Sequence, residues 1–97
     1  DFFETVKRRR SIRRYTGEPI PREHLEQIVD AGRQAASGYN RQPWLFIVVT
    51  ERAVIQQLCV AASWMDKAAA VIAVVMDPTG EFWLEDAAAA IENMLPR

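Results

Sequence analysis

One stretch decides the fold: Ser37-Gly38-Tyr39-Asn40-Arg41-Gln42-Pro43-Trp44-Leu45-Phe46-Ile47-Val48-Val49-Thr50. Its first four residues have the composition of a loop, and Pro43 bars a helix and favours an extended Gln42. Residues 44–50 are almost wholly apolar and rich in β-branched and aromatic side chains, which predicts a buried strand. A polar loop that leads directly into a core strand is typical of a binding site. The alternative is an ordinary connection in which Asn40 only completes its own turn.

A basic segment lies near the start of the chain. Six of the twelve basic residues fall within residues 7–14, around the hydroxyl of Ser11. The apolar spacing before it predicts a helix that ends near Arg9, followed by a short extended run. In an extended chain Arg9, Ser11 and Arg13 project from the same side, as donors for an anionic, oxygen-rich ligand. A solvated face, a localisation signal or a polyanion patch are the alternatives. Together with the polar loop, this segment predicts a site for a phosphate-bearing cofactor.

Periodicity predicts four helices and two strands. The helices lie near residues 1–9, 22–36, 51–63 and 81–95, and the strands near 44–50 and 70–77. Thr50 is a candidate N-cap for the third helix. The buried stripe of the second helix is predicted to comprise Leu25, Ile28, Val29, Gly32 and Ala36. A strand–helix–strand order would ordinarily give a parallel pair.

Composition indicates a globular domain, read as a single unit over residues 1–97. About half of the residues are apolar, a quarter are charged and the net charge is -1, which argues against disordered, fibrous and nucleic-acid-coating classes. A lone cysteine, Cys59, excludes an internal disulfide and is expected in the core. We therefore expect a cytoplasmic protein without a signal peptide, membrane span or nucleic-acid partner. No acidic cluster has metal-ligand spacing, and His24 is expected at the surface, so we expect no metal and no catalytic side chain.

The order of the motifs resembles the FMN-dependent nitroreductase superfamily. Arg9-Arg10-Ser11-Ile12-Arg13 comes first, then a helix after Pro21, and then Ala36-Ser37-Gly38-Tyr39-Asn40-Arg41-Gln42-Pro43-Trp44. Residues 68–78 resemble the family's second core strand, and residues 86–95 resemble the start of its central helix. The resemblance implies an α+β fold, a nitroreductase-like α/β/α sandwich with a mixed, mainly antiparallel sheet. Strand–helix–strand order alone would give a parallel pair, but we follow the antiparallel sheet that the resemblance implies.

The resemblance also implies a function and a site. It implies an enzyme that passes hydride from NADH or NADPH through FMN to nitroaromatics, quinones or similar acceptors, by a ping-pong scheme. It further implies a homodimer with FMN at the interface. Arg9, Arg10 and Ser11 would contact the phosphate and ribityl chain, and Arg13 the pyrimidine edge. The neighbouring subunit would contribute Ser37, Gly38 and Asn40, with Gln42 as a further candidate.

Some residues depart from the family pattern. The family's Ala-Pro-Ser is Ala35-Ala36-Ser37 here, and residues 61–65 lack the expected polar contact to the flavin ring. The C-terminal part of the family fold is expected to be absent, and dimerisation is expected to cover the surfaces this leaves open. A non-catalytic flavin-binding or interaction remnant is therefore the alternative function. A nucleic-acid-binding arm ranks last, and dehalogenation or flavin breakdown cannot be separated from nitroreduction by these residues.

Overall fold

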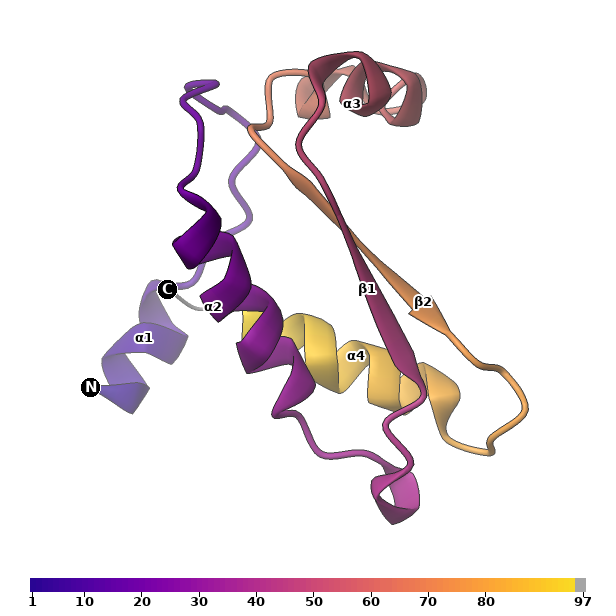
Figure 1. Cartoon of the computed structure of the whole chain (residues 1–97). Coiled ribbons are helices and arrows are strands. Elements are labelled where there is room, and N and C mark those ends of the chain that lie inside the picture. The colour runs from indigo at the N-terminus through magenta and orange to yellow at the C-terminus, as the bar shows by residue number, and fades with distance from the viewer. Residues whose placement is uncertain (96–97) are drawn as a thin grey trace.

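The structure is a computed structural model, and it describes residues 1–95. Within these residues, two helices are followed by a strand, a third helix, a second strand and a fourth helix (Figure 1). The helices are α1 (Phe2–Arg8), α2 (Arg22–Arg33), α3 (Arg52–Leu58) and α4 (Trp83–Met94), the strands are β1 (Trp44–Val49) and β2 (Val71–Met76), and short 3-10 turns occupy Gly38–Asn40 and Ser63–Met65.

The two strands pair in antiparallel fashion. Trp44 lies opposite Met76, and Val49 lies opposite Val71. This confirms the direction implied by the family resemblance and corrects the parallel pair that strand–helix–strand order would give. The reason is that α3 and the turn after it fold back at the end of the sheet and do not cross its face (Figure 1). Arg52 closes this connection, since its guanidinium donates to the carbonyls of Asp66 and Ala68.

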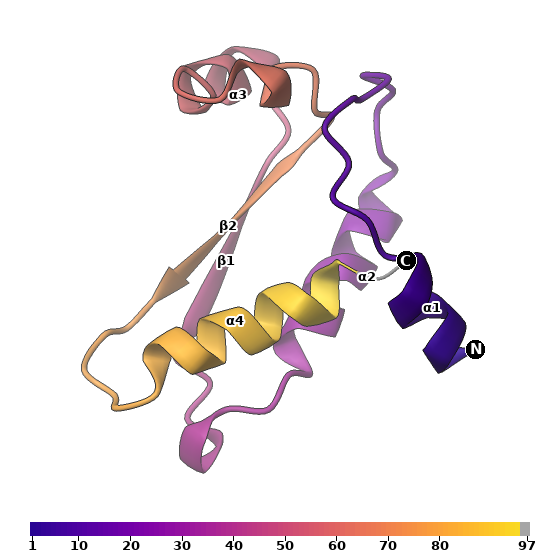
Figure 2. The ribbon, with the colours of Figure 1, turned by 180° about the vertical axis from the view of Figure 1, so that it is seen from behind.

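Within residues 1–95, helices cover one face of the sheet and leave the other open. Phe46 on this face contacts α2, and α4 crosses the same side of both strands (Figure 2). The opposite face carries Leu45, Ile47 and Val75, which are 61%, 46% and 45% exposed. The prediction of a buried first strand is therefore half wrong, because a wholly apolar strand has two apolar faces and this chain covers one of them.

Gly32 marks the closest approach of α2 to its neighbours. A β-carbon at this position would lie 3.0 Å from Met94 Sδ on α4 and 3.1 Å from Phe46 Cζ on β1. Asn93 ties the same helices together by donating its amide N–H to the carbonyl of Ala31 at 3.1 Å. Of the predicted stripe, Leu25 and Gly32 are buried, whereas Ala36 is exposed because α2 ends at Arg33. Absence of a side chain at residue 32 thus sets the spacing of α2, α4 and the sheet.

Replacing Gly32 with leucine is expected to destabilise the fold by about 1–3 kcal/mol, the usual cost of overpacking. The gain in helix propensity, about 1 kcal/mol, does not offset a side chain for which no space exists. Urea unfolding followed by circular dichroism measures the change. Gln27→Leu, at an exposed position of the same helix, is the control. Equal stability of both variants would contradict the packing described here.

The third helix is shorter than predicted and begins without a side-chain cap. It ends at Leu58 and not near residue 63, because the backbone leaves helical geometry at Cys59, where φ is -98° and ψ is 18°. Its N-cap residue is Glu51 and not Thr50, and Glu51 makes no capping hydrogen bond through its side chain. Ile55 and Cys59 are 0% and 3% exposed, which confirms the prediction that Cys59 is a core residue.

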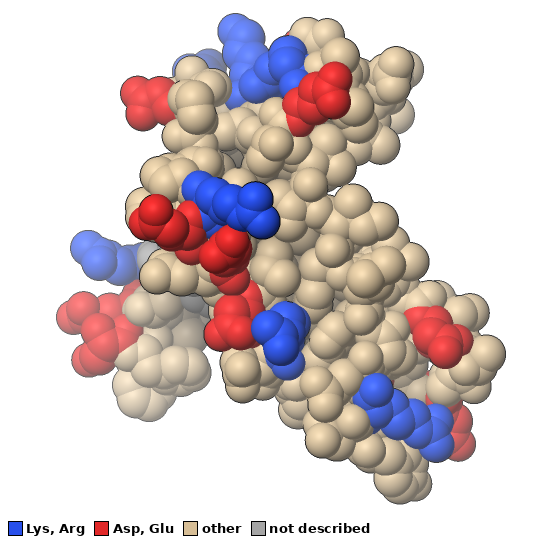
Figure 3. Space-filling view, viewed as in Figure 1, with Lys and Arg blue, Asp and Glu red and all other residues tan. Residues whose placement is uncertain are grey.

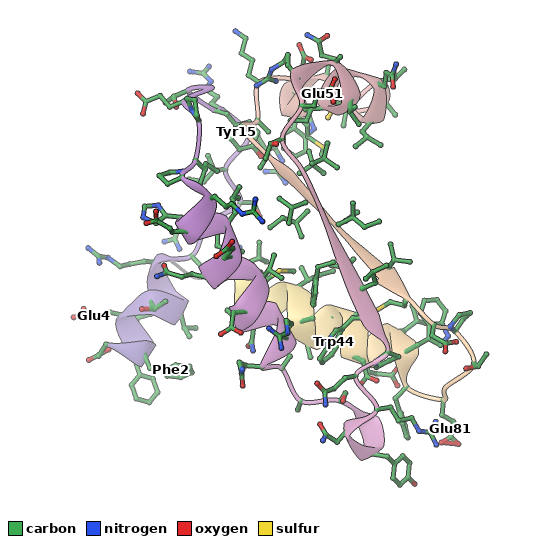
Figure 4. All side chains as sticks on the ribbon, viewed as in Figure 1. Phe2, Glu4, Tyr15, Trp44, Glu51 and Glu81 are labelled. Atoms are coloured by element: carbon green, nitrogen blue, oxygen red, sulfur yellow. The ribbon has the colours of Figure 1, made fainter. Side chains whose placement is uncertain are left out.

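Much apolar surface remains uncovered. The radius of gyration is 14.3 Å, compared with about 12.5 Å for a compact domain of this length. Helix α1 buries none of its residues, and its Phe2 and Phe3 are 71% and 72% exposed. Figure 4 shows Phe2 directed away from the rest of the molecule. No helix within residues 1–95 is long and apolar enough to cross a bilayer.

Candidate functional site

The basic segment follows α1 and has no regular structure. Arg9 leaves the helix with φ -57° and ψ 132°, and residues 9–21 form neither helix nor strand. Within residues 1–95, none of the six basic side chains between Lys7 and Arg14 forms an ion pair. Arg10 turns back and donates to the carbonyls of Lys7 at 2.6 Å and Arg9 at 2.8 Å. The segment therefore presents a cluster of positive charge in which no side chain is in ion-pair contact with a carboxylate of residues 1–95.

Trp64 supports the second half of this segment. The guanidinium carbon of Arg13 lies 5.7 Å from the Trp64 ring centroid, and the ring of Tyr15 stacks on Trp64 at 6.2 Å. Trp64 is 45% exposed, so it lies at the surface and not in the core. Its position in the turn Ser63–Met65 places it at the α3 end of the sheet, where it holds Arg13 and Tyr15.

The polar loop at residues 37–42 has an unusual backbone. Tyr39, Asn40 and Gln42 have φ values of 55°, 54° and 53°, a left-handed conformation that side chains disfavour. The expectation that Pro43 would make Gln42 extended is therefore wrong. Ser37 Oγ accepts the N–H of Gln42 at 3.1 Å, and the Gln42 amide donates to Asn40 Oδ1 at 3.2 Å. These two hydrogen bonds stabilise the strained backbone, since such conformations persist only where surrounding contacts enforce them.

Helix α4 supports the loop from the other side. Gly38 donates its N–H to Asp86 Oδ1 at 3.0 Å. The ring of Phe82 lies against Gly38 and 6.3 Å from the ring of Tyr39, whose other neighbour is the Arg41 guanidinium at 5.2 Å. Sequence reasoning did not predict the role of Asp86, because it lies 48 residues from Gly38 and no local spacing signals the pair. Phe82 itself is 38% exposed.

The turn between β2 and α4 completes this end of the molecule. Asp77 donates its N–H to the carbonyl of Pro43 at 2.9 Å, which ties the end of β2 to the start of β1. Thr79 donates two hydrogen bonds to the Asp77 carboxylate, from its backbone N–H and from its hydroxyl, and these bonds lower the pKa of Asp77 below its ordinary value. The carboxylate is therefore ionised at neutral pH and keeps both hydrogen bonds of the turn.

The two candidate segments lie at opposite ends of the molecule. Arg13 and Tyr15 lie against Trp64 near the start of β2, whereas the loop leads into the start of β1. The six-residue strands separate them by about 20 Å. Figure 4 shows Tyr15 and Trp44 at these two ends, and Figures 1 and 2 agree. Within one chain, the structure does not bring Arg9, Arg10, Ser11 and Arg13 together with Ser37, Gly38 and Asn40.

A groove between α2 and β1 contains neither segment. A groove of about 820 Å³ runs between α2 and β1, with Val29 and Val48 on its walls and Arg22 and Arg33 at its rim. Both arginines are paired, with Glu26 and Asp30 respectively. Among the described residues, no group of three His, Cys, Asp or Glu side chains gathers to hold a metal ion. His24 is exposed, as predicted.

Known proteins are similar to this chain in sequence and in fold. The family described as the nitroreductase family matches residues 6–95. A protein of Archaeoglobus fulgidus, provisionally named an NADH dehydrogenase/NAD(P)H nitroreductase, is 38% identical over 96% of this chain and 58% of its own length. A Bacteroides thetaiotaomicron structure with the same provisional name is 30% identical, with a TM-score of 0.91, over 96% of this chain and 58% of that one.

A third relative was solved with a ligand. This nitroreductase from Bacteroides fragilis, with bound FMN, is 27% identical and has a TM-score of 0.87 over 98% of this chain and 62% of that one. The comparisons confirm the nitroreductase-type α+β fold, and this chain spans somewhat more than half the length of each of the three relatives. The chain belongs to the nitroreductase family.

Proposed function

We propose that this chain binds FMN in a site shared between two copies. One copy supplies Arg9, Arg10 and Ser11 to the phosphate and ribityl chain, and Arg13 to the pyrimidine edge of the flavin. The other copy supplies Ser37, Gly38 and Asn40. The observation that carries the proposal is the cluster of cations in residues 7–14, none of which is paired with a carboxylate within residues 1–95.

The residues present fit a phosphate ester. Guanidinium groups offer forked N–H donors that match phosphate oxygens, and Ser11 adds a hydroxyl donor. Arg10 already donates to two backbone carbonyls, so Arg9, Ser11 and Arg13 are the better placed donors. The B. fragilis relative, whose structure contains FMN, supports the choice of this cofactor.

Two features support a homodimer. The two halves of the proposed site lie at opposite ends of one chain, so a second copy is needed to bring them together. Apolar surface on α1 and on the open face of the sheet is uncovered, including Phe2, Phe3 and Leu45. Figure 3 shows the region over the strands with few charged side chains between the charged ends of the molecule. Closed dimers are the commonest way for chains to bury such surface.

The proposed reaction is FMN-dependent transfer of electrons from NADH or NADPH to a small acceptor such as a nitroaromatic or quinone. When bound, FMN supplies the redox chemistry. The protein binds and orients it, and Arg13 places a cation where reduction develops negative charge. The names of the A. fulgidus and B. fragilis relatives support this reaction class. A single cysteine, which can form no internal disulfide, favours the cytoplasm as its location.

Anaerobic absorbance spectroscopy tests the proposal. The protein is loaded with FMN, freed of excess cofactor, and treated with NADPH or NADH. We expect a protein-bound flavin band that bleaches on adding the nicotinamide and returns on adding a quinone. A protein that retains no flavin would refute the proposal.

A second function is favoured by residues 61–65, which lack the polar contact to the flavin ring that the family resemblance implies. In this alternative, the chain binds flavin but does not catalyse turnover. A flavin band that persists after addition of both NADH and NADPH would support the alternative, and sustained oxidation of either nicotinamide would exclude it.

Replacing Trp64 with leucine is expected to weaken FMN binding by about two- to fivefold. The reason is that Arg13 loses a cation–π contact, which contributes about 0.5–1 kcal/mol at an exposed site. Titration by quenching of FMN fluorescence measures the change. Trp64→Phe is the control, because it keeps an aromatic ring beneath Arg13 and should retain most of the affinity. If Trp64→Leu binds as tightly as the unaltered protein, Trp64 does not position Arg13.

A further inference from the structure

We infer that Asp86, at the start of α4, is a positioning residue for the flavin site, and this inference rests on the proposed function. Asp86 is the sole charged residue among the buried side chains of residues 1–95, with an exposed fraction of 6%. Its carboxylate accepts the backbone N–H of Gly38, a proposed flavin contact, at 3.0 Å. It therefore acts on the flavin site through the backbone of the loop.

A buried carboxylate needs specific compensation. Taking a charge out of water costs several kcal/mol unless hydrogen bonds and fields stabilise it. Gly38 supplies a charge-assisted bond, roughly twice as strong as a neutral one. Asp86 also lies in the first turn of α4, where the helix dipole favours negative charge. The Asp86 carboxylate is thus stabilised by the Gly38 N–H and by the N-terminus of α4, and it links the loop to the beginning of this helix.

Phe82 restricts the loop at the same point. A β-carbon at position 38 would lie 2.5 Å from Phe82 Cδ2 and 3.1 Å from its Cβ, so only glycine fits beneath this ring. The first turn of α4 therefore contacts Gly38 in two ways, by a hydrogen bond and by close packing. Immediately after Gly38, the backbone adopts the positive φ values of Tyr39 and Asn40. Strained backbone of this kind relaxes once its supports are removed.

Loss of the carboxylate should release this loop. Asp86→Ala removes the acceptor of Gly38, and we expect FMN affinity to fall by about tenfold, the scale of one lost hydrogen bond to a charged group. Asp86→Asn keeps an oxygen of the same shape, so this variant should recover most of the affinity. Asp86→Leu has no acceptor but preserves most of the buried volume, so it separates loss of the hydrogen bond from loss of packing.

The experiment compares these three variants with Glu85→Ala, which removes the adjacent exposed carboxylate in the same turn. Fluorescence titration gives the FMN dissociation constant, and thermal unfolding reports whether each variant folds. The amide resonance of Gly38 in protein without FMN reports the hydrogen bond directly. We expect this resonance to move upfield in Asp86→Ala and Asp86→Leu, and to stay near its original position in Glu85→Ala.

The outcomes separate the inference from the proposed function. Weaker FMN binding in Asp86→Leu and Asp86→Ala, with recovery in Asp86→Asn and folded protein throughout, supports the inference. If the unaltered protein binds FMN and Asp86→Leu binds it equally well, the inference is overturned while the proposed function stands. If the unaltered protein binds no FMN, the proposed function fails and the inference fails with it. Should Asp86→Ala not fold, Asp86→Leu decides.

Discussion

Replacing Arg9 and Arg13 together with alanine is expected to weaken FMN binding by about two orders of magnitude or more. Each guanidinium would lose charge-assisted hydrogen bonds to an anionic ligand, which contribute about 1.5–3 kcal/mol per bond. One order of magnitude in affinity corresponds to about 1.4 kcal/mol. Titration of FMN fluorescence at two salt concentrations measures both the affinity and its electrostatic part. Salt should weaken binding by the unaltered protein more than binding by the variant.

A matched control removes two arginines elsewhere. Arg22 and Arg33 lie on α2, where each is paired with a carboxylate on the same helix. Arg22→Ala/Arg33→Ala changes the net charge by the same amount but leaves the basic segment intact. FMN affinity of this control should stay within about twofold of the original, since exposed pairs contribute little. Equal loss in the two double variants would mean that total charge, and not a defined phosphate site, governs binding.

Gly38→Ala is expected to disrupt the other half of the site. The new β-carbon would lie 2.5 Å from Phe82 Cδ2 and 3.0 Å from Cγ, too close to be relieved by movement of a flexible side-chain end. The loop must therefore shift, which costs about 1–3 kcal/mol in stability. We expect this displacement to reduce FMN affinity by up to about 10²-fold, because misplacing a functional group by about 1 Å can have an effect of this size. Chemical unfolding and FMN titration measure the two consequences.

Gly80→Ala provides the matching control. A β-carbon at residue 80 would lie 3.3 Å from Arg41 Nη1, the mobile end of a long side chain that can move aside. The control should therefore retain both stability and FMN affinity. If Gly38→Ala also retains both, the contact of Phe82 with the loop does not restrict its shape.

The helices and strands that could be predicted are those with clear local patterns. The apolar stripe of α2 correctly predicted that Leu25 and Gly32 are buried, because the apolar residues of an amphipathic helix recur on the face that packs against the core. Strand β1 was located to within one residue from its run of apolar side chains. Its exposure was not predictable in this way. Leu45 and Phe46 are both apolar, yet only Phe46 contacts a helix. The exposure of each residue depends on which face of the sheet the helices cover, and the local sequence does not encode this.

The shape of the polar loop depends on long-range contacts and not on local preference. Proline at 43 favours an extended residue before it. Gln42 nevertheless has a φ of 53°, with its N–H bonded to Ser37 Oγ. The support of Gly38 by Asp86 was equally invisible, because the pair forms only when α4 packs behind the loop. The antiparallel direction of strand pairing was predicted from the family resemblance. Periodicity could not predict it, because the alternation of side chains is the same in parallel and antiparallel strands.

The measurement that tests the shared site most directly is complementation between two defective variants. Arg9→Ala/Arg13→Ala keeps the polar loop, and Gly38→Ala keeps the basic segment. The two chains are produced together with different affinity tags, and FMN bound to purified mixed dimers is counted by absorbance. Each mixed dimer should contain one site with both halves intact, so purified mixed dimers should bind FMN at about half of their sites, as expected for a symmetric dimer. Mixed dimers that bind no more FMN than either variant alone would contradict a site built from two copies of this chain.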